Sequence, residues 1–150
     1  MSVVSFLNAA KELFEKNYFE EALCLTCIAV DACAAIQYPN KQVTERYKLF
    51  LKKNFNVITR FGFPGIYASS LRIKINGKVP NLILDEQGYV GMDQIIYHVI
   101  RCGLIHDCKI DHRICFTEKT IIGDWNEDKF FLPSAIIYGL IAAVEKNLIN

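Results

Sequence analysis

Apolar residues recur at helical spacing along the first part of the chain. They predict a helix over residues 2–16 capped by Ser2, followed by a longer helix over 18–37. The second helix is apolar almost all round, so it is expected to be buried or in an interface. A third helix is predicted over 41–60, with a break near Asn54. The apolar stripe of the first helix consists of Val3, Phe6, Leu7, Ala10, Leu13 and Phe14.

The pattern changes to alternation beyond residue 70. Apolar and charged residues alternate over 71–75 and lead to Asn76-Gly77, the dipeptide most typical of a tight hairpin turn. Residues 78–84 have the composition of a returning strand. The sequence therefore predicts a β-hairpin over this segment.

Two further helices and a strand-rich segment are predicted in the second half. The first helix covers 92–105, with Asp93 favourably placed in its first turn, and the last covers 133–148 and begins at Pro133. Residues 113–132 predict two or three short strands. Their turns are expected at Glu118-Lys119 and Asn126-Glu127. The buried stripe of the last helix is predicted to be Ile136, Ile137, Leu140, Ile141 and Val144.

These elements predict a mainly α protein: one domain over residues 1–150, a bundle of four to five helices with small β-hairpin insertions. The hydrophobic fraction of 52% and the mean hydropathy of +0.19 favour an additional partner surface. Asp31 and Glu145 interrupt the two longest apolar stretches, so no membrane span is expected. No basic leader precedes the first helix, and the six cysteines are therefore expected to be free thiols in a cytoplasmic protein.

Positive charge is concentrated in one segment. Residues 41–80 hold nine Lys and Arg against one acidic residue, a net charge of +8, whereas the rest of the chain carries eight basic and fifteen acidic residues, a net charge of −7. Such a segment favours binding of a polyanion such as RNA, because neutralised phosphates release counterions. A solvated lysine face is the alternative.

The stretch YHVIRCGLIHD, residues 97–107, places Arg101 and His106 five positions apart. On an unbroken α-helix five residues turn the chain by about 140°, so the two side chains would point to different sides. Either the helix ends near Gly103, which would turn His106 toward Arg101 or toward a second subunit, or another group completes the pair. Helical spacing further predicts one polar stripe, formed by Gln94, His98, Arg101 and Ile105.

This stretch resembles the Arg-x4-His signature of the HEPN superfamily of small helical domains. The resemblance implies a metal-independent endoribonuclease in which two protomers bring their motifs together. It also implies a toxin, phage-defence or RNA-processing setting, in which an antitoxin or another operon partner protein is expected. The chemistry suits these residues, because a guanidinium stabilises charge on a phosphate and an imidazole transfers protons near neutral pH.

The site predicted in this way needs neither metal nor cofactor. Arg101 and His106 are the candidate catalytic residues, and Cys102 and Asp31 are candidates for orienting them. Family members commonly have Asn, Asp or His where this chain has Cys102, and a thiol is a poor hydrogen-bond donor. The candidate RNA-binding residues are His98, Lys48, Lys52, Lys53, Arg72 and Lys74.

Structural roles for the same residues remain open. Arg101 would equally serve as the partner of Asp31, since a buried carboxylate needs a cation, and His106 would serve as a helix cap. His98 would then be a surface histidine. The cysteines and histidines between residues 102 and 115 match no regular zinc-ligand spacing. The sequence therefore leaves two functions open: a ribonuclease, and a non-catalytic RNA-binding or protein-interaction module.

Overall fold

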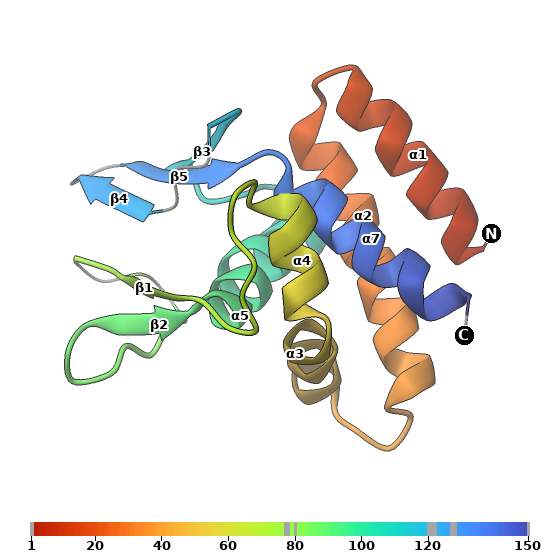
Figure 1. Cartoon of the computed structure of the whole chain (residues 1–150), viewed down its shortest axis with the longest axis horizontal. Coiled ribbons are helices and arrows are strands. Elements are labelled where there is room, and N and C mark those ends of the chain that lie inside the picture. The colour runs from red at the N-terminus through yellow and green to blue at the C-terminus, as the bar shows by residue number, and fades with distance from the viewer. Residues whose placement is uncertain (1, 77–78, 80, 120–122, 127–128, 150) are drawn as a thin grey trace.

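The computed structural model describes residues 2–76, 79, 81–119, 123–126 and 129–149. The chain is mainly helical, with two small sheets (Figure 1). None of the described helices is both long enough and apolar enough to cross a lipid bilayer.

The N-terminal helices follow the predicted pattern. Helix α1 spans Val3–Glu15, and Ser2 caps it through a reciprocal pair of hydrogen bonds with Ser5. Helix α2 spans Phe19–Gln37 and packs against α1, α3 and α7, which explains why it is apolar on all sides. Figure 1 shows it at the centre of the helical part of the molecule.

The predicted break at Asn54 separates two helices. Helix α3 spans Val43–Lys53 and α4 spans Phe55–Gly62. The side chain of Asn54 is buried, donates a hydrogen bond to the Phe50 carbonyl oxygen and accepts one from Asn147, which stabilises the junction.

The predicted hairpin turn leads to a different pairing. Strand β1, Arg72–Lys74, pairs antiparallel with β2, Tyr89–Gly91, and not with the described part of the predicted returning strand. Among the described residues of that segment, 79 and 81–84 form no strand. Asp85 explains the pairing, because its carboxylate accepts hydrogen bonds from the backbone amides of Gln87 and Tyr89 and starts a turn that leads into β2. Gly77 and Lys78 lie outside the described residues.

The second sheet has the order β3, β5, β4, with β3 parallel and β4 antiparallel to β5. The strands are β3 Ile114–Thr117, β4 Gly123–Asn126 and β5 Lys129–Pro133, in agreement with the predicted two or three strands. The chain bends at the predicted turn residues Glu118 and Lys119. The predicted turn at Asn126-Glu127 includes Glu127, which lies outside the described residues.

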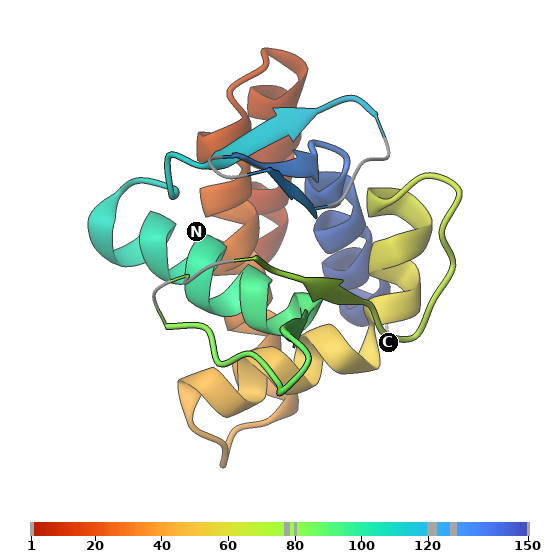
Figure 2. The ribbon, with the colours of Figure 1, turned by 90° about the vertical axis from the view of Figure 1, so that its left-hand side faces the viewer.

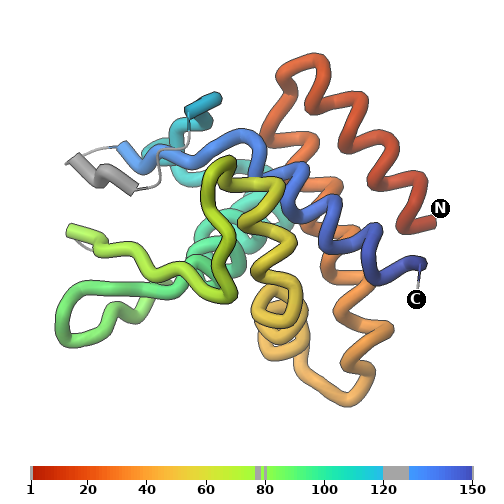
Figure 3. Tube along the Cα trace, in the orientation of Figure 1, coloured from red at the N-terminus to blue at the C-terminus, as the bar shows by residue number. Residues whose placement is uncertain are grey.

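The last helix, α7, spans Ile136–Leu148, so it begins later than predicted. Pro133 ends β5, and the amide of Ser134 instead donates to the Thr117 carbonyl oxygen. The predicted stripe is confirmed as buried core: Ile136, Ile137, Leu140, Ile141 and Val144. Figure 3 shows that α7 returns the C-terminus to the same side of the molecule as the N-terminus.

Helices α4 and α7 approach each other closely through two glycines. A Cβ atom built on Gly139 would collide with the carbonyl oxygen of Ile58, and one built on Gly62 would lie 2.9 Å from the Cα atom of Ile136. These neighbours are backbone atoms, which cannot rotate away.

We expect Gly139→Ala to lower the free energy of unfolding by about 2 kcal/mol, because overpacking outweighs the better helix propensity of alanine. In thermal unfolding this corresponds to a fall in Tm of roughly 4–8 °C. Ala142→Ser, on the same helix, is the control and should unfold close to wild type. An unchanged Tm for Gly139→Ala would show that α4 and α7 are less closely packed.

Candidate functional site

The segment that carries the Arg-His motif is a continuous helix with an unusual centre. It begins as α5, Met92–Gln94, continues as the π-helix η1, Ile95–Arg101, and ends as α6, Cys102–Asp107. Of the two alternatives, a helix end near Gly103 is therefore not found. The helix ends at Cys108, whose backbone is left-handed at a φ of 51°.

Gly103 has a different role from the one predicted. A Cβ atom at this position would lie 2.7 Å from the Lys109 carbonyl oxygen, and the Lys109 amide donates back to the Gly103 carbonyl oxygen. The glycine allows the chain that leaves α6 to fold back against the helix, so it shapes the wall beside His106.

The π-helix also changes which side chains share a face. A π-turn holds more residues than an α-turn, so the step of three residues from His98 to Arg101 falls further short of a full turn than it does in an α-helix. Arg101 consequently points toward α2 and is only 8% exposed, whereas His98 lies at the surface of the helix beside α3. The predicted common stripe of Gln94, His98, Arg101 and Ile105 is thus wrong.

Arg101 is held by the carboxylate that the sequence singled out. Its Nε and Nη2 atoms donate to Oδ2 of Asp31 at 3.0 Å and 2.5 Å, and its guanidinium carbon lies 5.5 Å from the centre of the Tyr97 ring. Burial opposes the charged guanidinium, but the hydrogen bonds and charge of Asp31 prevail and raise the pKa of Arg101. The arginine is therefore a fixed cation.

The remaining terminal nitrogen of this guanidinium contacts the motif histidine. Nη1 of Arg101 lies 3.3 Å from Nε2 of His106. A guanidinium only donates, so Nε2 accepts and the proton of the neutral imidazole is on Nδ1. His106 is exposed, whereas Arg101 and Asp31 lie beneath it. Positions 101 and 106 point to different sides of the helix, but the arginine side chain is long enough to reach the imidazole of His106.

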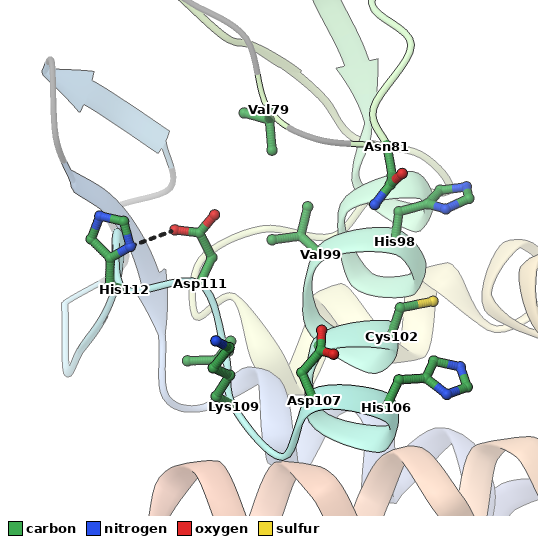
Figure 4. Close-up of a pocket in the computed structure, with 12 residues that line it drawn as sticks. Val79, Asn81, His98, Val99, Cys102, His106, Asp107, Lys109, Asp111 and His112 are labelled. Carbon is green, nitrogen blue, oxygen red and sulfur yellow. Dashed lines mark ion pairs between the residues drawn. The ribbon is translucent and has the colours of Figure 1, made fainter.

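A cleft of about 550 Å³ lies along this helix (Figure 4). Figure 4 shows His98, Cys102 and His106 in a row on one side of the helix, with Val99 and Asp107 projecting from the other. Cys102 is half-buried and, after Asp31, contributes to the raised pKa of Arg101. The lining is Val79, Asn81, His98, Val99, Cys102, Gly103, His106, Asp107, Lys109, Ile110, Asp111 and His112.

The predicted RNA-binding residues divide into three groups. Lys48 lies on α3 with its Nζ atom 2.8 Å from Nε2 of His98. Lys52 and Arg72 line a second hollow of about 370 Å³, where Lys52 faces Asp93 at 3.8 Å and Arg72 is also paired with Asp85. The third group, Lys53 and Lys74, is exposed outside both hollows.

Several residues of the site were missed at the sequence level. Tyr97 packs against Arg101 and bonds the Thr44 hydroxyl at 2.7 Å, and its position four residues before Arg101 was a usable signal. Asn81 and Asp111 reach the cleft from outside the motif helix and had no local signal.

No group of three or more His, Cys, Asp or Glu side chains is arranged to hold a metal ion within the described part of the chain. Cys27, of the Cys24-x2-Cys27 pair, is fully buried, and burial raises the pKa of its thiol to about 12. It therefore belongs to the core.

Comparison with known proteins places the chain in one family. The model of the family described as Rv1289 matches residues 3–145. The chain belongs to the Rv1289 family. No match was found among curated proteins or among solved structures. The match covers every helix of this Rv1289 family member up to residue 145, including the motif helix and Asp31.

Proposed function

We propose that this Rv1289 family member is a metal-independent endoribonuclease of the HEPN type. The observation that carries the proposal is the contact of Arg101 with His106 at the rim of a cleft, with Asp31 fixing the guanidinium from below. The proposal includes the finer fold description, a HEPN-like bundle of four to five helices with small β-hairpin insertions.

The geometry suits attack by the 2′-hydroxyl of the RNA on its own phosphate. The fixed guanidinium offers Nη1 to the phosphate, where negative charge increases in the transition state. A phosphate that takes this donor frees Nε2 of His106, which then accepts or donates a proton. The nucleophile belongs to the RNA, so no step requires a metal ion.

The proposal extends to a homodimer, because the reaction needs two proton transfers. One group must deprotonate the 2′-hydroxyl and another must protonate the leaving 5′-oxygen. Each protomer places one imidazole beside its arginine, and a two-fold pairing of the motif helices supplies the second. A cytoplasmic toxin or phage-defence setting with an antitoxin or operon partner protein is proposed from the HEPN resemblance alone.

The experiment is incubation of purified protein with mixed tRNA and mRNA in EDTA. Cleavage into discrete fragments is expected from wild type, and the double variant Arg101→Ala, His106→Ala controls for contaminating nuclease. Intact RNA with the wild-type protein would instead favour the second function, a non-catalytic RNA-binding or protein-interaction module, for which Cys102 at the position after the arginine is the supporting feature.

The exposed lysines at the end of α3 provide a separate prediction about RNA binding. If Lys52 and Lys53 contact phosphates, their joint replacement by Glu weakens RNA binding without unfolding the protein. The slope of log affinity against log salt should become shallower by about 0.7 per lost single-strand contact. Fluorescence anisotropy at several salt concentrations measures this slope, and an unchanged slope would show that these lysines form only a solvated face.

A further inference from the structure

The pair formed by Lys48 and His98 is built differently from an ordinary surface lysine. Both side chains are partly buried, and the Lys48 ammonium donates to Nε2 of His98 at 2.8 Å while lying 5.4 Å from the centre of the Tyr97 ring. Among the described residues, no carboxylate lies within ion-pair distance of Lys48. The nearby Asp93 instead faces Lys52 at 3.8 Å. The ammonium therefore contacts neutral groups, and no carboxylate of the described residues forms an ion pair with it.

Burial and nearby charges shift the pKa values of both groups. Burial lowers the pKa of Lys48. Burial and the positive charge of Lys48 both lower the pKa of His98. Asp93 acts in the opposite direction on both groups. A bound anion would relieve the burial cost of the ammonium, and the neutral imidazole would donate its Nδ1 proton.

The pair lies in line with the proposed cleavage centre. His98, Cys102 and His106 occupy successive turns along one side of the motif helix (Figure 4). Five of the eight steps between the two histidines lead from Arg101 into α6 at about 1.5 Å each, so the histidines are more than about 7.5 Å apart along the helix axis. Asp107 projects from the other side of the helix, away from the three side chains of this row.

We infer that Lys48 and His98 form a second phosphate subsite, and that the substrate is a single RNA strand whose backbone runs along the motif helix from this subsite to Arg101 and His106. The inference rests on the proposed function, since it assigns the substrate of the same cleft. The separation of the histidines exceeds one nucleotide step, so the two subsites hold different phosphates of one strand.

A flexible single strand fits this arrangement better than a duplex. The row runs along a cleft of about 550 Å³, and a single strand can follow the cleft with its bases turned toward the apolar walls, Val79 and Val99. A duplex presents its phosphates on a rigid, wide surface.

The test uses 2′-O-methyl oligouridylates, which cannot be cleaved through the 2′-hydroxyl. Binding of a two-nucleotide and a six-nucleotide strand is measured by calorimetry with wild type, Lys48→Gln and His98→Gln. Lys16→Gln, at the end of α1, is the control. Circular dichroism establishes that each variant is folded.

We expect Lys48→Gln and His98→Gln to bind the six-nucleotide strand roughly tenfold more weakly at low salt, with a salt slope for Lys48→Gln lower by about 0.7. Both should bind the two-nucleotide strand as wild type does, because its single phosphate occupies only the Arg101 subsite. Equal losses for both lengths, no loss for either, or no binding of either strand by wild type would overturn the inference. Length-dependent binding by a protein that cleaves no RNA would retain the subsite and contradict only the proposed catalysis.

Discussion

His106→Ala is expected to reduce RNA cleavage at least about 100-fold while leaving the fold intact. General acid–base groups typically contribute 10²–10⁴-fold to rates, and alanine cannot transfer a proton. The imidazole is exposed and is hydrogen-bonded to Arg101, so its loss removes little packing. Initial rates on a labelled RNA and thermal unfolding of the same sample measure the two effects.

The matched control for this experiment is His112→Ala. His112 lines the same cleft, but its side chain is 91% exposed and lies beside Asp111, away from His106 (Figure 4). Cleavage by this variant should equal that of wild type. A large fall in Tm for His106→Ala, with cleavage retained, would show that the contact with Arg101 is structural only.

Asp31→Asn should have the largest effect on stability. The pair with Arg101 is mostly buried, with side-chain exposures of 19% and 10%, and removal of one charge leaves the guanidinium without its counter-ion. Breaking a buried ion pair costs about 3 kcal/mol, which lowers Tm by roughly 6–12 °C in a chain of this length. Cleavage should fall as well, because Arg101 loses the two hydrogen bonds that fix it.

Glu145→Gln is the control for Asp31→Asn, since it removes the carboxylate of an exposed pair with Lys11. Exposed pairs contribute about 0–1 kcal/mol, so its Tm should stay close to that of wild type. Equal behaviour of the two variants would contradict the view that Asp31 and Arg101 form a buried, mutually dependent pair.

Local patterns were sufficient to predict most of the helices. The cap at Ser2, the apolar α2 and the break at Asn54 each depend on residues close in sequence, and the structure confirms all three. Asp31 was recognisable as a partner for Arg101 because it is a lone charge in an apolar helix, although the two residues lie 70 positions apart.

The failures have different physical causes. The pairing of β1 with β2 depends on the turn built around Asp85, which the Asn76-Gly77 signal outweighed at the sequence level. The π-helix leaves the apolar pattern of residues 92–105 looking α-helical, so the orientation of Arg101 was not predictable from period alone. Figure 2 shows how the motif helix runs between the two sheets and α2, where these contacts meet.

The chemistry of the RNA ends tests the central claim most directly. A synthetic RNA with one mapped cleavage position is incubated in EDTA with the wild-type protein, beside a copy that carries 2′-deoxyribose at that position. The account predicts fragments that end in a 2′,3′-cyclic phosphate from the first strand and no cleavage of the second. Cleavage of the deoxy strand at the same position, or cleavage only after Mg²⁺ or Zn²⁺ is added, would contradict it.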